Sequence, residues 1–384
     1  MELIGTREVE IKAARGNILD SSGEKLVSTK LVYNVEIYKT KIDNDTLNNS
    51  LLLLAKTLEE NGDKYVDNFP ITINPFSFKN EETATNFKTA NKIDSSYDAE
   101  ACFNYFKERY KINNDNIEDT RKIITLRYEI EKDGYSNTKS VELASNISNA
   151  SLAKINEMGS SFPGINTVSE PTIYYPYGEL ASHILGYVGP IGEKELKENP
   201  EIYDQNDIIG KGGIEQVFEK YLKGTDGIKQ IGMSVDGIVT DEYTSKEAIA
   251  GNDIMLTIDA NLQKITEDAL AHNIEMMQNG ELPGAETASE GAAVVINVKT
   301  GEILAMASYP NYNPSLFVDG ISTENWNNYL NDSRHPLINK AISSISPPGS
   351  TFKMVTAIAG LESGAIDVNT KINDTGKYTY YKDY

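Results

Sequence analysis

Ser346-Pro-Pro-Gly-Ser350-Thr-Phe-Lys353, followed by Met-Val-Thr-Ala-Ile-Ala-Gly-Leu-Glu-Ser-Gly364, carries the most information about the fold. Two prolines and a glycine disfavour a helix before Ser350, whereas the apolar residues after it have helical spacing and predict a helix that ends near Gly364. Ser350 is therefore expected at a helix N-terminus. Because Lys353 follows three residues later, its amine and the Ser350 hydroxyl are expected on one helix face, within mutual reach.

This placement suits nucleophilic catalysis by a serine. A serine is a weak nucleophile that must pass its proton to a nearby base. Lys353 can act as that base only when neutral, and burial and the positive end of the helix dipole both disfavour its charged form. The free backbone N–H of Ser350 can form half of an oxyanion hole. On spacing alone, an N-cap serine followed by a surface lysine is an equally good interpretation.

The S-x-x-K spacing also occurs at three other places, which we attribute to chance. Ser22 lies in a predicted turn, Ser136 in a polar loop, and Ser151 at the start of a charged helix whose lysine can reach solvent. The three pairs are Ser22/Lys25, Ser136/Lys139 and Ser151/Lys154.

The composition excludes several classes of function. A formal net charge of −21 over 384 residues disfavours nucleic acid as a partner, because phosphate binding requires clustered Lys and Arg. Cys102 is the only cysteine, so thiolate zinc sites and intrachain disulfides are excluded, and its apolar setting predicts a small buried side chain. The apolar stretches are shorter than a membrane span, and residues 1–8 do not resemble a signal peptide, so a soluble chain is expected.

The first part of the chain alternates between strand-like and helical patterns. Residues 7–40 predict two strands joined by a turn at Asp20-Ser-Ser-Gly23. From about residue 45 to 160 the pattern is mostly helical and charged, which indicates an inserted helical lobe. Its expected helices cover 51–58, 97–110, 115–130 and 141–158.

The second part begins with turns rich in Gly, Pro and Tyr over 174–192. An amphipathic helix is expected over 213–223, then strand-like runs through 239, and then a helix after 259. Residues 280–290 have no periodicity and indicate a loop near a domain boundary. Residues 292–309 predict a β-hairpin whose turn contains Lys299-Thr-Gly301.

Several of these stretches resemble the motifs of one family. Pro347-Pro-Gly-Ser-Thr-Phe-Lys353 is similar to the active-serine motif of the penicillin-binding proteins, and Asn339-Lys-Ala341 and Leu304-Ala-Met-Ala-Ser-Tyr-Pro310 resemble parts of the same transpeptidase domain. Ala14-Arg-Gly-Asn-Ile-Leu-Asp20-Ser-Ser-Gly23 resembles the signature that opens the pedestal of class B members. Within this class the chain most resembles the elongation-type branch, because three further stretches are similar to motifs of that branch: Tyr175–Gly189, Gly212–Glu215 and Leu126–Tyr128.

The resemblance implies an α+β fold in two parts. Residues 1–285 would form a β-rich pedestal, or dimerisation-type domain, with the helical insertion at about 45–160. Residues 286–384 would form the N-terminal part of a transpeptidase domain of the serine β-lactamase-like type.

The resemblance also implies an activity. Ser350 and Lys353 would be catalytic residues of a peptidoglycan D,D-transpeptidase that uses no cofactor and no metal. Its partners would be peptidoglycan stem peptides, β-lactams and a membrane-embedded glycan polymerase. The intact parent would act at the outer face of the bacterial cytoplasmic membrane.

The chain departs from the family pattern in two respects. The family uses an S-x-N and a later K-T-G after the active serine, and this sequence reaches Tyr384 before either. Lys299-Thr-Gly301 lies upstream and corresponds to the first hairpin turn. The family's N-terminal membrane helix has no counterpart here. We therefore expect a piece lacking both ends, inactive by itself.

Two rival interpretations remain. The chain could be a non-catalytic pedestal that contacts the cell-wall synthesis machinery. A β-lactamase or β-lactam sensor would share the S-x-x-K spacing, but neither needs a pedestal of this size.

The remaining candidate residues are expected to be structural. Arg15 and Asp20 are predicted to form an ion pair that stabilises a turn between pedestal strands. His183 has no partner histidine nearby, so metal binding is not expected there. Lys340 stands where the family usually has arginine, without an expected catalytic consequence.

Overall fold

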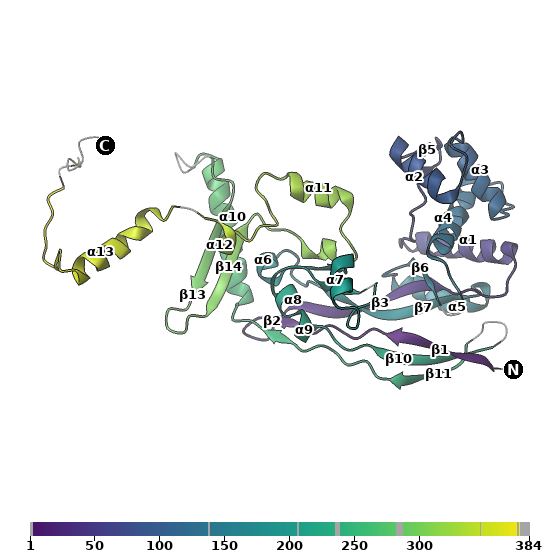
Figure 1. The fold of residues 1–384 in the computed structure, drawn as a ribbon, viewed down its shortest axis with the longest axis horizontal. Helices are drawn as coiled ribbons and strands as arrows, with labels where there is room; N and C mark the ends of the chain where they lie inside the picture. The colour runs from purple at the N-terminus through teal and green to yellow at the C-terminus, as the bar shows by residue number, and fades with distance from the viewer. Residues whose placement is uncertain are drawn as a thin grey trace.

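We describe the protein from a computed structural model that covers residues 3–136, 139–205, 207–234, 239–281, 287–345, 347–374 and 376. Two long, mainly antiparallel sheets form the pedestal, below the helical lobe in Figure 1. Strand β3 (Lys25–Ile37) pairs with β7 (Ile165–Tyr174) along ten residues, and with β6 (Val141–Ala144) and β2 (Ile18–Leu19) at its two ends. Strand β12 (Ile254–Met255) runs parallel to β2.

The second sheet corrects the predicted pairing of residues 7–40. Strand β1 (Leu3–Ile11) pairs with β10 (Gly227–Ser234), which in turn pairs with β11 (Val239–Lys246). The turn at Asp20–Gly23 instead joins the short strand β2 to β3. Sequence periodicity identifies strands but not their partners, because many distant strands offer equivalent backbone groups.

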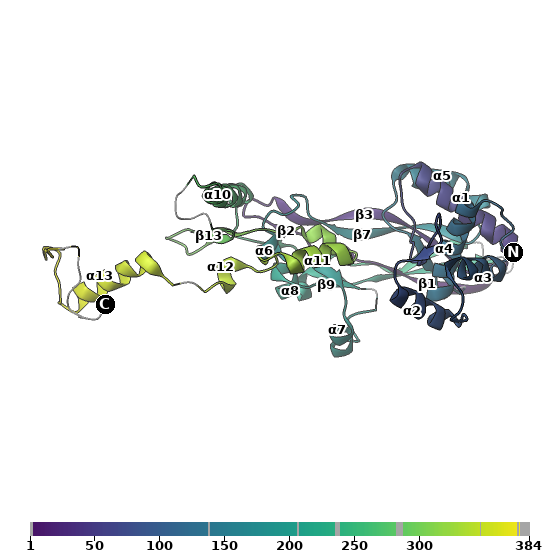
Figure 2. The ribbon, with the colours of Figure 1, turned by 90° about the horizontal axis from the view of Figure 1, so that it is seen from above.

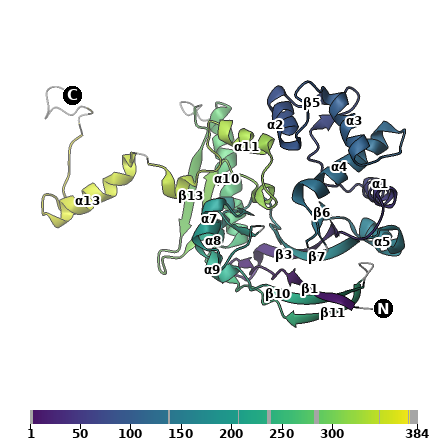
Figure 3. The same cartoon turned by 45° about the vertical axis from the view of Figure 1, so that its right-hand side comes forward.

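The helical lobe stands over the β3–β7 sheet (Figures 1 and 3). In five of these helices, the side chain of the N-cap residue accepts a hydrogen bond from the backbone N–H three residues later. These caps are the local reason that the helices begin where they do. Cys102 is fully buried, as predicted. The lobe contains α1 (Asn44–Glu60), α2 (Glu81–Asn91), α3 (Ala99–Arg109), α4 (Ile117–Asp133), α5 (Asn149–Glu157) and strands β4 (Ile71–Thr72) and β5 (Ser77–Phe78).

The helix predicted over 141–158 is wrong in its first part. Val141 and Leu143 are buried and Glu142 between them is exposed, so residues 141–144 alternate as strand β6 at the edge of β3. The helix α5 begins only after its N-cap Ser148. A run of four residues is too short for its sequence to distinguish the period of a strand from that of a helix.

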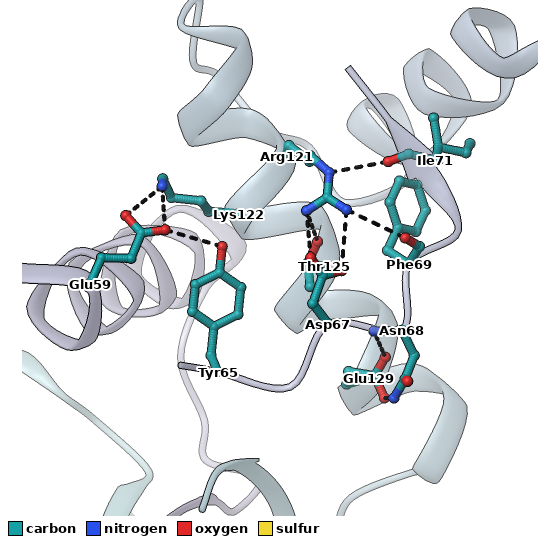
Figure 4. A network of polar contacts seen from close by, with 10 residues as sticks. All are labelled: Glu59, Tyr65, Asp67, Asn68, Phe69, Ile71, Arg121, Lys122, Thr125 and Glu129. Atoms are coloured by element: carbon teal, nitrogen blue, oxygen red, sulfur yellow. Dashed lines mark hydrogen bonds and ion pairs between the residues drawn. The ribbon is translucent and has the colours of Figure 1, made fainter. Parts of the chain in front are cut away.

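Polar contacts join α4 to the loop that precedes β4 (Figure 4). The Arg121 guanidinium bonds to both Asp67 oxygens and to the carbonyls of Phe69 and Ile71. The buried Glu129 carboxylate accepts from the backbone and side-chain nitrogens of Asn68. These bonds fix the loop and the start of β4 against the helix, because they satisfy the carbonyls of Phe69 and Ile71 and the N–H of Asn68.

A series of short elements links strand β7 to strand β10. The helix predicted over 213–223 is broken at Phe218, beyond which the Glu219 carboxylate accepts from Gly210 N–H. The elements between β7 and β10 are α6 (Ser182–Leu185), β8 (Val188–Pro190), α7 (Glu193–Glu198), β9 (Ile208–Gly210), α8 (Gly213–Val217) and α9 (Glu219–Leu222), and η1 (Gly159–Ser161) lies earlier, between α5 and β7.

The C-terminal region is built on the predicted hairpin, with β13 (Gly291–Ile296) antiparallel to β14 (Ile303–Tyr309). Helix α10 (Ala260–Gln278) packs along β14, where the buried Gln263 amide bonds both the N–H and the C=O of Met306 at 2.8 Å. The Gln263 side chain therefore occupies part of the edge of β14 that does not face β13. The predicted boundary loop 280–290 lies partly outside the described residues.

The chain continues through η2 (Pro314–Phe317), α11 (Thr323–Asn331), α12 (Lys340–Ser343), η3 (Gly349–Thr351) and α13 (Phe352–Glu362). Figures 1 and 2 show α13 standing apart from the other elements, at one end of the long axis. In the part of the chain described here, no helix combines the length and apolar character needed to cross a membrane.

Candidate active site

Ser350 lies in a tight turn that runs directly into helix α13. It occupies the 3₁₀ helix η3, and α13 begins two residues later at Phe352. Gly349 enters this turn at a φ of +54°, a conformation that glycine adopts without strain. The helix ends at Glu362, followed by Gly364 at a φ of +68°. The predicted start and end of this helix are confirmed.

The Ser350 and Lys353 side chains are both exposed. The structure records no hydrogen bond between these two described residues, so their direct contact stays a prediction. Among the described elements, α13 packs to any extent only against the adjacent turn η3. Lys353 therefore lacks the burial that would favour its neutral form. Apolar side chains of α13 are correspondingly exposed: Phe352, Met354, Val355, Ile358 and Leu361.

The three other S-x-x-K pairs have structural roles. Ser22 donates its hydroxyl to Asp20 inside the β2–β3 turn. Ser136 accepts from the backbone N–H of Lys139. Ser151 is fully buried in α5, and Lys154 bonds to Glu60 on α1. Lys299-Thr-Gly301 forms the hairpin turn, as expected.

The predicted ion pair between Arg15 and Asp20 is wrong. Arg15 instead contacts Glu215 and Glu219, both at 2.6 Å, from the Gly212–Glu215 stretch and the helix after it. Asp20 accepts from the backbone N–H groups of Ser22, Glu24 and Ala260. Burial acts to raise the pKa of Asp20, but hydrogen bonds from the Ser22 hydroxyl and from these three N–H groups outweigh it and lower the pKa, so the carboxylate is satisfied without a cation.

Close backbone packing accounts for the glycine beside Arg15. A Cβ on Gly16 would lie 2.0 Å from the carbonyl oxygen of Asn252. The guanidinium beside it is buried, and Glu215 is 1% exposed in its side chain. Burial raises the pKa of Glu215, and the Arg15 charge opposes that rise. The motif therefore forms a buried charged junction within the pedestal.

His183 lies where the pedestal meets the C-terminal region. Its Nε2 is 2.7 Å from the carbonyl of Pro336, and its ring packs edge-on against Tyr312. Burial lowers the pKa of His183, which favours a neutral ring with its proton on Nε2, facing that carbonyl. A cavity of about 330 Å³ adjoins the ring, lined partly by Lys211 and Ile342. Among the described residues, no group of three or more His, Cys, Asp or Glu side chains could hold a metal ion.

The sequence assigns no role to the Asn339 amide, which bonds to two segments of the chain. Its Nδ2 donates to the carbonyl of His183 at 3.1 Å, and its Oδ1 accepts from the Ser308 hydroxyl at 3.3 Å. An asparagine before a short helix predicts an N-cap. No local signal predicts that this side chain contacts a segment 156 residues away.

Two family models match the chain. Residues 10–256 match the penicillin-binding protein dimerisation domain, and residues 291–384 match the penicillin-binding protein transpeptidase domain. The whole of α10 lies between the two matches, so the predicted boundary at 285 stays a prediction.

Curated relatives support the same assignment. The peptidoglycan D,D-transpeptidase MrdA of Acinetobacter baumannii is 35% identical over 242 residues, which are 63% of this chain and 34% of that protein. MrdA of Escherichia coli K12 is 34% identical over 242 residues, 62% of this chain and 36% of that protein. The aligned part thus spans about a third of these relatives' length.

Solved structures share the fold. A complex of penicillin-binding protein PBP2 and MreC from Helicobacter pylori matches with a TM-score of 0.62 at 24% identity, covering 96% of this chain and 54% of that one. A structure titled for coordinated polymerization and crosslinking by a peptidoglycan synthase complex matches with a TM-score of 0.59 at 23% identity, covering 96% and 50%. The predicted α+β fold is confirmed. With a dimerisation-type pedestal followed by transpeptidase residues, the chain belongs to the penicillin-binding protein family, among relatives of the predicted class B, elongation type.

Proposed function

We propose that this chain is part of a serine D,D-transpeptidase that cross-links peptidoglycan. The observation that carries the proposal is the position of Ser350, in a turn that opens helix α13 with Lys353 just inside it, within the region that matches the transpeptidase domain. The MrdA relatives are named for this activity. In the assembled enzyme no cofactor is required, because serine supplies the nucleophile and lysine the base.

The reaction would proceed in two acyl transfers. The Ser350 hydroxyl attacks the penultimate D-Ala carbonyl of a stem peptide while its proton passes to neutral Lys353. The C–N bond breaks, the terminal D-Ala leaves with a proton on its nitrogen, and an ester to Ser350 remains. An amine of a second stem peptide then attacks the ester and restores the serine. A β-lactam would acylate Ser350 in the same way, through opening of its ring.

Fluorescent penicillin labelling tests this proposal. We expect little labelling of the 384-residue chain and stoichiometric labelling of a longer form that carries the family's S-x-N and K-T-G motifs. The expectation follows because α13 is uncovered here, so the Ser350 site lacks the surrounding groups that would bury Lys353. Ser350→Ala should abolish the labelling, and Ser22→Ala, which changes another S-x-x-K serine, should leave it intact. Stoichiometric labelling of the shorter chain would refute the expectation of inactivity, and an unlabelled longer form would refute the proposed function.

A second candidate is a non-catalytic role for this part of the chain, favoured by the exposed positions of Ser350 and Lys353. In that role the pedestal would contact the wall-synthesis machinery, including a membrane-embedded glycan polymerase, at the outer face of the cytoplasmic membrane. The solved complexes of similar fold, one with MreC and one described as a peptidoglycan synthase complex, support such partners. Co-purification of residues 1–285 with a detergent-solubilised polymerase would support this role, and binding only by the longer form would contradict it.

A further inference from the structure

Three consecutive pedestal residues each bind a different segment of the C-terminal region. The N–H of Ala181 donates to Glu267 on α10 at 2.9 Å. The carbonyl of Ser182 accepts from the Tyr312 hydroxyl at 2.9 Å, and the carbonyl of His183 accepts from Asn339. We refer to residues 181–183 as the docking turn. These three contacts use backbone groups of the turn, so they depend on the path of the chain. The His183 side chain adds a further contact, to the carbonyl of Pro336.

The Asn339 contact differs from ordinary helix capping. Asn339 is the N-cap residue of α12, yet its side chain makes no bond to its own helix. The N–H of Ala341 in the first turn donates instead to the Ser308 hydroxyl at 3.2 Å. Because Ser308 supplies the cap from strand β14, the Asn339 amide is available to bridge β14 and the docking turn.

The bridge lies directly before the segment that carries Ser350. Helix α12 ends at Ser343, seven residues ahead of Ser350. A second contact, from His183 to the carbonyl of Pro336, holds the chain on the other side of Asn339. A displacement of the docking turn would therefore move the start of the serine-bearing segment.

We propose that Asn339 is a positioning residue that couples the pedestal to the Ser350 segment through the docking turn. The inference rests on the proposed function, since it assigns Asn339 a part in setting the geometry of acylation. Asn339 does not touch the reacting atoms. Its effect is to hold the chain that leads to them in one register against the pedestal, and a misplacement of about 1 Å can cost about 10²-fold in rate.

Two substitutions separate the two bonds of Asn339. Asn339→Ala removes both bonds. Asn339→Asp preserves the size and still accepts from the Ser308 hydroxyl, but it has no N–H for the carbonyl of His183 and places a carboxylate oxygen against it. Asn327→Asp is the matched control, because Asn327 is exposed on α11 and the structure shows no hydrogen bond from its side chain. If the link to the pedestal matters, the first two variants should behave alike.

The contact itself is tested on the 384-residue chain by hydrogen exchange and mass spectrometry. We expect amides of residues 181–187 to exchange several-fold faster in Asn339→Asp than in the unsubstituted chain, with no change in Asn327→Asp. Equal exchange in all three proteins would overturn the inference. This measurement requires no catalysis, so it is independent of the proposed function.

The coupling is tested by acylation kinetics in the longer form that carries the later motifs. The first-order acylation constant for a chromogenic β-lactam should fall by about 10-fold or more in Asn339→Ala and Asn339→Asp. The constant for non-covalent binding should change less than about three-fold, which a general loss of structure would not produce. Acylation within two-fold of the unsubstituted longer form would overturn the coupling. Absence of acylation in the unsubstituted form would instead refute the proposed function.

Discussion

Arg15 shows how one buried cation organises the pedestal. Its guanidinium lies between the carboxylates of Glu215 and Glu219, and Glu215 Oε1 has no hydrogen-bond partner. Breaking a buried pair by removing one partner is much costlier than breaking an exposed one, because the remaining charge stays unpaired. The motif glycine and arginine therefore act together, since the close approach at Gly16 brings Arg15 into this position.

Arg15→Met should lower the free energy of unfolding by about 3 to 5 kcal/mol. The matched control is Lys194→Met, which removes one member of an exposed ion pair with Glu198 and should cost less than about 1 kcal/mol. Urea denaturation followed by circular dichroism measures both changes. Equal losses in the two variants would show that Arg15 is not structurally central.

Lys353→Arg tests the proton acceptor at the candidate site. In the longer form we expect acylation by a chromogenic β-lactam to fall by about 10²-fold or more, because an arginine remains protonated and cannot accept the Ser350 proton. The substitution preserves positive charge, so an electrostatic aid would be largely retained. Circular dichroism verifies the fold, and a rate within a few-fold of the unsubstituted protein would rule out Lys353 as the base.

Three neighbouring strands bring carboxylates together on the pedestal. Glu36 on β3 is directly opposite Glu142 on β6, and the Asn34 amide donates to both Glu142 and Glu170. Burial, together with the negative charges of Glu170, Glu36 and Asp319, raises the pKa of Glu142 to about 7. Its side chain still reaches the surface, so solvent screening limits the energetic effect to about 1 kcal/mol or less.

The free energy of unfolding should therefore decrease as the pH rises past the pKa of Glu142. The folded-state pKa of Glu142 exceeds its ordinary value of 4.5, so the native protein binds more protons than the unfolded chain between about pH 4.5 and 7, and this group's contribution is lost across that range. We expect Glu142→Gln to be more stable than the unsubstituted chain at pH 8, and to show a smaller difference at pH 5. Thermal unfolding at both values measures this. A stability difference that does not depend on pH would contradict the assignment.

The whole molecule places a β-rich pedestal between a helical lobe and the C-terminal region (Figure 3). The pedestal has its own buried cluster around Ile18, Leu26 and Leu185, the lobe has another, and a third joins lobe helices to strands β3, β6 and β7. Helix α10 lies before the predicted boundary at 285, yet it packs along β14 beyond that boundary. The division into 1–285 and 286–384 therefore remains our proposal, to be tested by separating the parts.

Residues 1–285 should unfold cooperatively when expressed alone, because the pedestal and lobe clusters lie almost wholly within them. Thermal unfolding by circular dichroism tests this. Amides of α10 should exchange faster in 1–285 than in the 384-residue chain, since Gln263 loses its bonds to Met306. A gradual, non-cooperative melt would refute the proposed boundary, and unchanged exchange in α10 would show that the hairpin does not stabilise this helix.

Local signals determined much of the fold and the Ser350 helix. Prolines and Gly349 before Ser350, the apolar spacing after it and the glycine at 364 act within a few residues, so they are readable directly from the sequence. The hairpin over 292–309 and the buried Cys102 follow from equally local patterns. The resemblance to the penicillin-binding proteins can be recognised for the same reason, because it consists of short contiguous motifs.

Only the tertiary structure decided which distant groups meet. Strand β1 pairs with β10 more than 200 residues later, Arg15 with Glu215, and Asn339 with the docking turn. Sequence assigned Arg15 to the nearby Asp20 because proximity along the chain was the only available guide. Folding brings remote partners within hydrogen-bonding distance, and among many chemically equivalent carboxylates and carbonyls the three-dimensional path of the backbone selects the one that is satisfied.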